Sequence, residues 1–212
     1  MSLKENETFF AQSPVLPVVT PNSAASGIAI CRILFNAGLR VQEITLRTRS
    51  GLETIAALRE EIPELIIGAG SVLTPEMGDA AIQEGAQFLV SPGTNDALLK
   101  FAATCSVPFL PGVATVSEMM LVLAMGCTTA KLFPADALGG VTFLRSIAGP
   151  LPSMKFCPAG GLDAKLATCY LQLSNVIAVA GSWMIPNDLV ARNKFDDIRI
   201  LADQAAALQR LQ

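Results

Sequence analysis

The sequence predicts an α/β fold in which strands and helices alternate and close into a single (β/α)8 TIM barrel. Eight short apolar runs begin about 21 to 26 residues apart, which leaves room for one helix and two short loops in each interval. Most runs are apolar at successive positions, as in parallel strands that are covered on both faces. A doubly wound open sheet is the alternative fold.

The predicted elements follow one another without a linker, a low-complexity tract or a charge run. The eight strands are expected at residues 15–19, 41–46, 65–72, 87–93, 108–113, 129–135, 154–161 and 176–182.

Three intervening segments carry helix signals. Residues 23–39 end at a glycine suited to a C-cap, residues 51–62 are amphipathic, and residues 115–127 open with Thr115 and Glu118 at capping-box spacing. We expect one domain over residues 1–212, with residues 1–13 as an N-terminal extension or a short helix before the first strand.

The composition excludes several classes of protein. Of the 212 residues, 51% are hydrophobic and 16% are charged, which suits a large core. The formal charge is −3 and the basic residues are scattered, so no nucleic-acid partner is expected. The beginning of the chain does not resemble a signal peptide, and no apolar run reaches the ~18 residues that span a bilayer. These features predict a cytoplasmic protein without a membrane partner.

The chain has no histidine, which limits the chemistry open to it. Ser-His-Asp and Cys-His catalysis are excluded, and the usual imidazole ligands of zinc are absent, so no metal site is expected. The five cysteines form no C-x-x-C pair and are expected to be reduced. Residues 68–71 read GAGS, which lacks the third glycine of a dinucleotide-binding motif, so no cofactor is expected.

Strand alternation directs two ionisable side chains to the interior. Glu43 and Arg47 share one face of the second strand, and Lys131 and Phe133 share one face of the sixth. A lysine inside a barrel is costly unless it is paired or used. One interpretation is a Lys131–Glu43 ion pair that only fills the barrel.

The functional interpretation assigns each of these groups a role. Lys131 is a Schiff-base nucleophile, Glu43 is the general acid/base, and Arg47 binds a substrate carboxylate. Because an ionised carboxylate in contact would favour the charged amine, this interpretation expects Glu43 to lie near the substrate and slightly away from Lys131.

Two small-residue loops follow the seventh and eighth predicted strands. They contain Gly160 and Gly161 in PAGGLD, and Gly181 and Ser182 in AGSWM. In (β/α)8 barrels, the loops after these two strands frequently bind phosphate through backbone N–H groups. We therefore predict a phosphate site there.

Eight stretches along the chain resemble one family: EITLRT, GAGSVL, AQFLVSPG, PGVATVSE, KLFPAD, GGVTFLRSIAGP, FCPAGG and AGSW. They are similar to class I 2-keto-3-deoxy-6-phosphogluconate aldolases, also called 4-hydroxy-2-oxoglutarate aldolases, from about residue 14 onward. The resemblance implies a metal-independent, homotrimeric lyase. Its products would be pyruvate and glyceraldehyde 3-phosphate, or pyruvate and glyoxylate from the shorter substrate.

The resemblance also implies roles for individual residues. Lys131 corresponds to the Schiff-base lysine of the K-x-F-P-A motif. Glu43 and Arg47 correspond to the glutamate and the arginine of the E-x-T-L-R motif. The phosphate contacts fall on Gly160, Gly161 and Ser182, while Pro92 and Phe133 border the pyruvyl group.

The chain departs from the family pattern at two positions. Ser71 stands where a threonine is usual and keeps the hydroxyl that contacts the pyruvyl carboxylate. Ala159 stands where a threonine is frequent and removes a hydroxyl. The loss of one such hydrogen bond, worth ~0.5 to 1.5 kcal/mol, would relax discrimination between C4 epimers, or between phosphorylated and shorter substrates.

Two rival functions differ in what they predict. A phosphate-binding barrel isomerase or epimerase would use Glu43 as its base and form no covalent adduct. A non-enzymatic sugar-phosphate binding protein would keep Lys131 and Glu43 as a structural pair, and a ligand would stabilise it without being converted to product.

Overall fold

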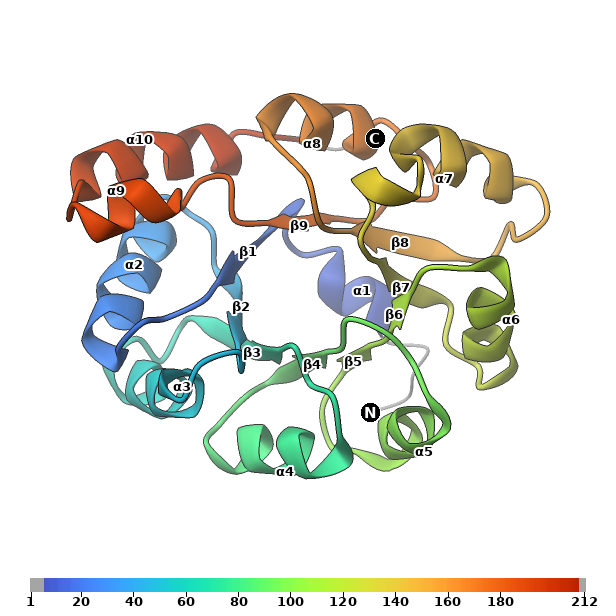
Figure 1. Cartoon of the computed structure of the whole chain (residues 1–212), viewed down its shortest axis with the longest axis horizontal. Helices are drawn as coiled ribbons and strands as arrows, with labels where there is room; N and C mark the ends of the chain where they lie inside the picture. The colour runs from blue at the N-terminus through green and yellow to red at the C-terminus, as the bar shows by residue number, and fades with distance from the viewer. Residues whose placement is uncertain (1–5, 210–212) are drawn as a thin grey trace.

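Strands and helices alternate along the chain in the computed structural model, which describes residues 6–209 (Figure 1). The strands are β1 (Val15–Val19), β2 (Val41–Thr45), β3 (Ile66–Gly70), β4 (Phe88–Val90), β5 (Phe109–Leu110), β6 (Gly112–Val113), β7 (Thr129–Leu132), β8 (Lys155–Pro158) and β9 (Val179–Gly181). The longer helices are α2 (Ala24–Asn36), α3 (Ser50–Glu61), α4 (Pro75–Gln83), α5 (Asp96–Thr104), α6 (Val116–Ala124), α7 (Gly140–Ala148), α8 (Ala164–Leu171) and α10 (Phe195–Ala206). Shorter helices are α1 (Asn6–Phe10), the 3₁₀ turn η2 (Asp136–Leu138) and α9 (Asn187–Ala191).

The strands form two curled sheets in which every pairing is parallel. One sheet has the order β5-β4-β3-β2-β1-β9, and the other has the order β6-β7-β8. From β1 to β5 the spatial order follows the chain order, without the reversal that a doubly wound sheet requires. The α/β fold with parallel strands is therefore confirmed, and the doubly wound alternative is wrong.

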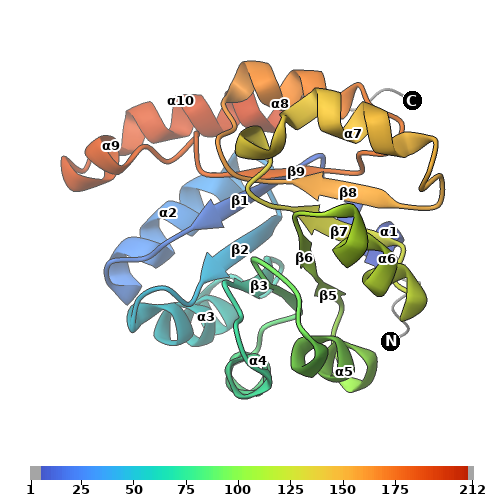
Figure 2. The ribbon, with the colours of Figure 1, turned by 45° about the vertical axis from the view of Figure 1, so that its right-hand side comes forward.

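The two sheets approach each other at both of their edges. At one edge, β5 and β6 are separated only by Pro111. The ladder is interrupted there because a proline has no N–H to donate to a neighbouring strand. The single strand predicted over residues 108–113 is therefore divided. At the other edge, isolated bridges join Phe156 to Val176 and Ala159 to Ala180, linking β8 and its end to the segment that contains β9. Figure 2 shows β8 and β9 running side by side.

The predicted helices are confirmed where the sequence gave a local signal. The helix α2 begins after Ser23, whose hydroxyl accepts a hydrogen bond from the Ser26 N–H. The helix α6 has the predicted capping box, in which Thr115 and Glu118 each accept a hydrogen bond from the other's backbone N–H. Within the predicted extension 1–13, α1 is the short helix that was expected; residues 1–5 lie outside the described part.

The core has two layers, one between the sheets and the surrounding helices and one inside the curl of the strands. Figure 1 shows α1 in the middle of the strands. There the ring of Phe10 packs edge-on against Phe88, with centroids 5.4 Å apart. The helix α1 thus covers the interior near the point where β4 begins.

The predicted orientation of β2 and β7 is confirmed. Val41 belongs to the inner layer, whereas Ile44, Ala130 and Leu132 belong to the helix-facing layer. The side chain of Gln42 donates hydrogen bonds to two carbonyl oxygens at and just after α2, at 2.8 and 3.1 Å. Residues that alternate with these side chains along β2 and β7 therefore face the interior.

No helix in the described part of the chain has the length and apolar character needed to cross a bilayer.

Candidate active site

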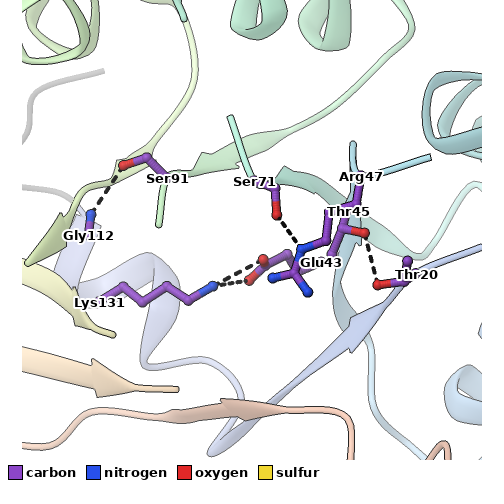
Figure 3. A network of polar contacts seen from close by, with 8 residues as sticks. All are labelled: Thr20, Glu43, Thr45, Arg47, Ser71, Ser91, Gly112 and Lys131. Atoms are coloured by element: carbon purple, nitrogen blue, oxygen red, sulfur yellow. Dashed lines mark hydrogen bonds and ion pairs between the residues drawn. The ribbon is translucent and has the colours of Figure 1, made fainter. Parts of the chain in front are cut away.

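Lys131 and Glu43 meet inside the fold as a buried ion pair (Figure 3). The Nζ atom of Lys131 lies 3.1 Å from each carboxylate oxygen of Glu43. Glu43 has no exposed surface, and Lys131 is 4% exposed. The prediction that both groups point inward is confirmed. The expectation that Glu43 lies slightly away from the amine is wrong, because opposite charges that have both lost water are stabilised by direct contact.

Gly70, the last residue of β3, leaves the space that the carboxylate of Glu43 occupies. A Cβ atom at position 70 would lie 2.0 Å from Oε1 of Glu43, much closer than atoms can approach. β3 pairs with β2, and Gly70 stands opposite Thr45 in their register. Any larger residue at position 70 would displace the carboxylate. Sequence reasoning had assigned this glycine no such role.

Arg47 and Ser71 lie beside the ion pair, just beyond the ends of β2 and β3 (Figure 3). The Nε–H of Arg47 donates to the hydroxyl of Ser71 at 2.9 Å. Ser71 has a φ of 59°, a left-handed backbone conformation that is uncommon for residues other than glycine. Among the described residues Arg47 donates no other hydrogen bond, so most of its guanidinium donors remain free for a bidentate contact with a carboxylate.

A cavity of about 140 Å³ brings together most of the predicted site residues. Seven of the ten line it: Arg47, Lys131, Phe133, Gly160, Gly161, Gly181 and Ser182. Glu43 and Ser71 are not part of the lining, but they accept hydrogen bonds from Lys131 and Arg47, which are. Pro92 does not line it, and its backbone packs against Gly112, which stands opposite Lys131 in the register of β6 and β7.

The remaining wall of this cavity is apolar. It is formed by Val18, Ala159, Leu162 and Ala180. Val18 is paired in register with Glu43 and faces the inner core layer. Strand alternation along β1 could have identified it, because residues 16, 18 and 20 share a face. Because Ala159 has no hydroxyl, this wall offers no side-chain hydrogen bond beside Phe133 and Gly160.

The loop after β8 contains two successive glycines in the left-handed region of the backbone. Gly160 and Gly161 have φ values of 93° and 79°, which favour glycine. A Cβ atom at Gly161 would lie 2.6 Å from the Cβ of Asp136. The N–H groups of these two glycines take part in no hydrogen bond among the described residues, and α8 begins shortly after them. Free N–H groups near a helix N-terminus attract phosphate.

Cys157 is a buried neighbour of the ion pair that sequence reasoning had assigned no specific role. It stands opposite Lys131 in the register of β7 and β8 and is fully buried. Burial raises the pKa of its thiol to about 12, an effect that the charge of Lys131 opposes and that of Glu43 reinforces. The thiol is therefore neutral near Lys131 at physiological pH. The described residues contain no cluster of acidic or cysteine side chains that could hold a metal ion.

Comparisons with known proteins bear on this geometry. The model of a family described as KDPG and KHG aldolase matches residues 7–201. A 2-dehydro-3-deoxy-phosphogluconate aldolase from Dickeya dadantii is 40% identical over 201 residues, which covers 95% of this chain and 94% of that protein. The KHG/KDPG aldolase from Escherichia coli is 40% identical over 199 residues, which covers 94% and 93%.

Two solved structures are similar over nearly their whole length. A KDPG aldolase from Legionella pneumophila, with pyruvate captured as a covalent carbinolamine intermediate, has a TM-score of 0.92 and 37% identity and covers 95% of this chain and 98% of its own. The 2-keto-3-deoxy-6-phosphogluconate aldolase of Zymomonas mobilis with 3-phosphoglycerate has a TM-score of 0.91 and 36% identity and covers 99% and 98%.

The state of Cys157 leads to a test of the site's electrostatics. At pH 8 the aromatic disulfide reagent DTNB should react quickly with the exposed Cys169 and leave Cys157 unreacted until the protein unfolds, because only a thiolate reacts. Cys169→Ser should remove the fast phase. Rapid labelling of native Cys157 would contradict this description.

The raised pKa of the Cys157 thiol also predicts how the stability of the fold depends on pH. The contribution of this thiol to stability should be complete below about pH 9 and should disappear as the pH rises toward about 12, because the folded state holds the thiol proton more tightly than the unfolded state.

Proposed function

The chain belongs to the KDPG and KHG aldolase family, and on that premise we propose that Lys131 acts through a Schiff base with the 2-keto group of its substrate. Members of this family are aldolases, which are lyases. The proposed substrate is 2-keto-3-deoxy-6-phosphogluconate, cleaved to pyruvate and glyceraldehyde 3-phosphate, with 4-hydroxy-2-oxoglutarate cleaved to pyruvate and glyoxylate as a second reaction. The observation that carries the proposal is a buried amine in contact with a carboxylate at the wall of a cavity. No metal or cofactor takes part.

The remaining groups of the cavity suit the two ends of this substrate. Arg47, with Ser71 held against it, would bind the carboxylate next to the keto group. Phe133 and Pro92 would border the pyruvyl carbons. At the other end, the N–H groups of Gly160 and Gly161 would bind the phosphate, together with Gly181 and Ser182, which line the same cavity.

The contact between Lys131 and Glu43 supports the first chemical step. An ammonium cannot attack a carbonyl, so the amine must first give up a proton, and Glu43 is positioned 3.1 Å away to accept it. The free amine then adds to C2 and forms a carbinolamine. Glu43 returns the proton to the departing oxygen, water leaves, and an iminium remains. A covalent carbinolamine of pyruvate is the species captured in the Legionella relative.

The same carboxylate can serve the cleavage step. Glu43, directly or through a water molecule, takes the proton of the C4 hydroxyl as the bond between C3 and C4 breaks. The electron pair of that bond moves toward the iminium nitrogen and forms an enamine, and C4 becomes the carbonyl of the released aldehyde. Protonation at C3 and hydrolysis of the iminium release pyruvate and restore Lys131.

We also propose that the two sheets act as one closed (β/α)8 barrel and that the chain is a single domain. The connection through Pro111 at one edge and the bridge between Ala159 and Ala180 at the other support closure. One cooperative urea transition, the same by tryptophan fluorescence and by circular dichroism, is expected. Two separate transitions would contradict a single domain.

A cytoplasmic location is proposed for the same chain. All five cysteines are free, as is usual for proteins of a reducing compartment. Detection of the chain in a membrane or extracellular fraction of the source cells would contradict this location.

Replacement of Lys131 tests the Schiff base. Lys131→Met should abolish pyruvate release in an assay coupled to lactate dehydrogenase. It also leaves Glu43 buried without a partner, at a cost of about 3 to 5 kcal/mol. Lys131→Arg is the matched variant, because it keeps a cation beside Glu43 but presents no nucleophilic amine. Substantial lyase activity in folded Lys131→Arg would contradict the assignment of Lys131 as the Schiff-base nucleophile.

Replacement of Glu43 tests the proton carrier. Glu43→Gln keeps the shape of the side chain and removes its basicity, so kcat should fall about 10²- to 10⁴-fold. The exposed Glu60→Gln serves as the control and should behave like the parent protein. A normal turnover rate in Glu43→Gln would exclude Glu43 as the base.

An apolar surface on α6 supports self-association, and we propose that this helix lies in the subunit interface of the homotrimer that the family resemblance implies. Met120 and Leu121 are 59% and 53% exposed, and Val116 and Met125 extend the same surface. Light scattering should give the mass of three chains, and Leu121→Glu should shift it toward one. A monomeric parent protein would contradict the proposal.

A further inference from the structure

A second cavity, of about 550 Å³, adjoins the catalytic one. The two share Val18, Arg47 and Ser182 in their linings. The lining of the second cavity comes from the end of β1, from α2 and from α9, elements that lie on the left of Figure 1. A substrate chain held at Lys131 would reach it by passing Arg47 and Ser182.

Besides Arg47 and Ser182, which it shares with the catalytic cavity, the second cavity carries three neutral polar side chains of its own. Thr20, Asn22 and Asn187 line it, together with apolar residues that include Val19 and Ile30. A hydroxyl and two amides can each donate and accept hydrogen bonds. By contrast, the wall beside Lys131 is apolar at Ala159 and Ala180. Hydroxyl groups on a substrate would therefore find side-chain partners mainly in the second cavity.

Thr20 is oriented by a hydrogen bond that connects it to the catalytic strand. The buried hydroxyl of Thr45 donates to the Thr20 oxygen at 2.9 Å (Figure 3). Thr45 lies two residues after Glu43 on the same face of β2, so Thr20 is held close to the reacting groups. Because its oxygen already accepts this hydrogen bond, the proton of Thr20 is free to be donated into the cavity.

The charges around the second cavity suit hydroxyl groups better than a phosphate. Arg47 is the cation in its lining, and the proposed function already assigns it to the substrate carboxylate. Asp188, next to Asn187 in the first turn of α9, would repel a dianion. The free N–H groups of Gly160 and Gly161 belong to the catalytic cavity instead. The two cavities thus favour different chain ends.

We propose that the second cavity is a polar subsite for the hydroxyl-bearing chain of substrates without a phosphate, with Thr20 as a specificity-determining donor. The ligand class is the unphosphorylated polyhydroxy 2-keto acid. The inference rests on the proposed function, because the keto group must be held at Lys131. Phosphorylated chains extend toward Gly160 and Gly161, whereas unphosphorylated chains extend toward Thr20, Asn22 and Asn187.

The test compares 2-keto-3-deoxygluconate with its 6-phosphate as substrates of the same proteins. Thr20→Val removes the donor at nearly constant shape and should lower kcat/KM for the unphosphorylated substrate about 2- to 12-fold, the effect of one hydrogen bond. The phosphorylated substrate should change less than about twofold. Thr20→Ser should restore the parent values. Thr104→Val, at the exposed end of α5, is the matched control and should change neither substrate.

A second variant guards against an effect of Thr20→Val on folding through Thr45. Asn187 is exposed, and Asn187→Ala should also reduce kcat/KM for the unphosphorylated substrate alone. An equal loss on both substrates, or no loss on either, would overturn the subsite. A parent protein that cleaves only the phosphorylated substrate would also overturn it and leave the proposed function intact. A parent protein that cleaves neither would contradict the proposed function itself.

Discussion

The buried pair of Lys131 and Glu43 sets the requirements that the rest of the structure meets. The two residues are 88 positions apart in sequence and come from different sheets, so their contact depends on the curl that brings β7 opposite β2. Gly70 provides room for the carboxylate, since any Cβ there would collide with it. Cys157, opposite Lys131 in the register of β7 and β8, adds a neutral thiol. Each of these residues maintains an environment in which two charges can lie close together away from water.

Such a pair contributes little to stability when both desolvation penalties are counted. Apolar residues of similar volume would often stabilise a core equally well or better. Its chemistry gives the pair a clearer physical rationale, because a proton can pass between an amine and a carboxylate in contact. The carboxylate that stabilises the ammonium is also the group that can accept its proton, and a substrate carboxylate at Arg47 would enter within reach of both.

Much of the fold follows from short-range patterns that a sequence displays directly. The spacing of apolar runs predicted the alternation of strands and helices, and strand alternation predicted which faces of β2 and β7 point inward. Lys131 was identifiable because it is the one charged residue in the apolar run of residues 129–135. The capping box of α6 was visible because its two residues are close in sequence.

Other features depend on distances between segments far apart in the chain, which no local pattern encodes. The division of one predicted strand at Pro111 reflects a missing backbone donor within a curved sheet. The direct contact of Glu43 with Lys131, and the position of Pro92 outside the cavity lining, depend on how two sheets meet. The second cavity depends on α9, a five-residue helix without a recognisable motif.

The most direct test of the central claim, that Lys131 is the Schiff-base nucleophile, is borohydride trapping. The protein is incubated with pyruvate, reduced with borohydride, digested and mapped by peptide mass spectrometry, with Lys131→Arg as the control. We expect a stable reduced adduct on Lys131 in the parent protein and none in the variant. A folded parent protein that forms no adduct, or forms it on another lysine, would show that Lys131 is not the nucleophile.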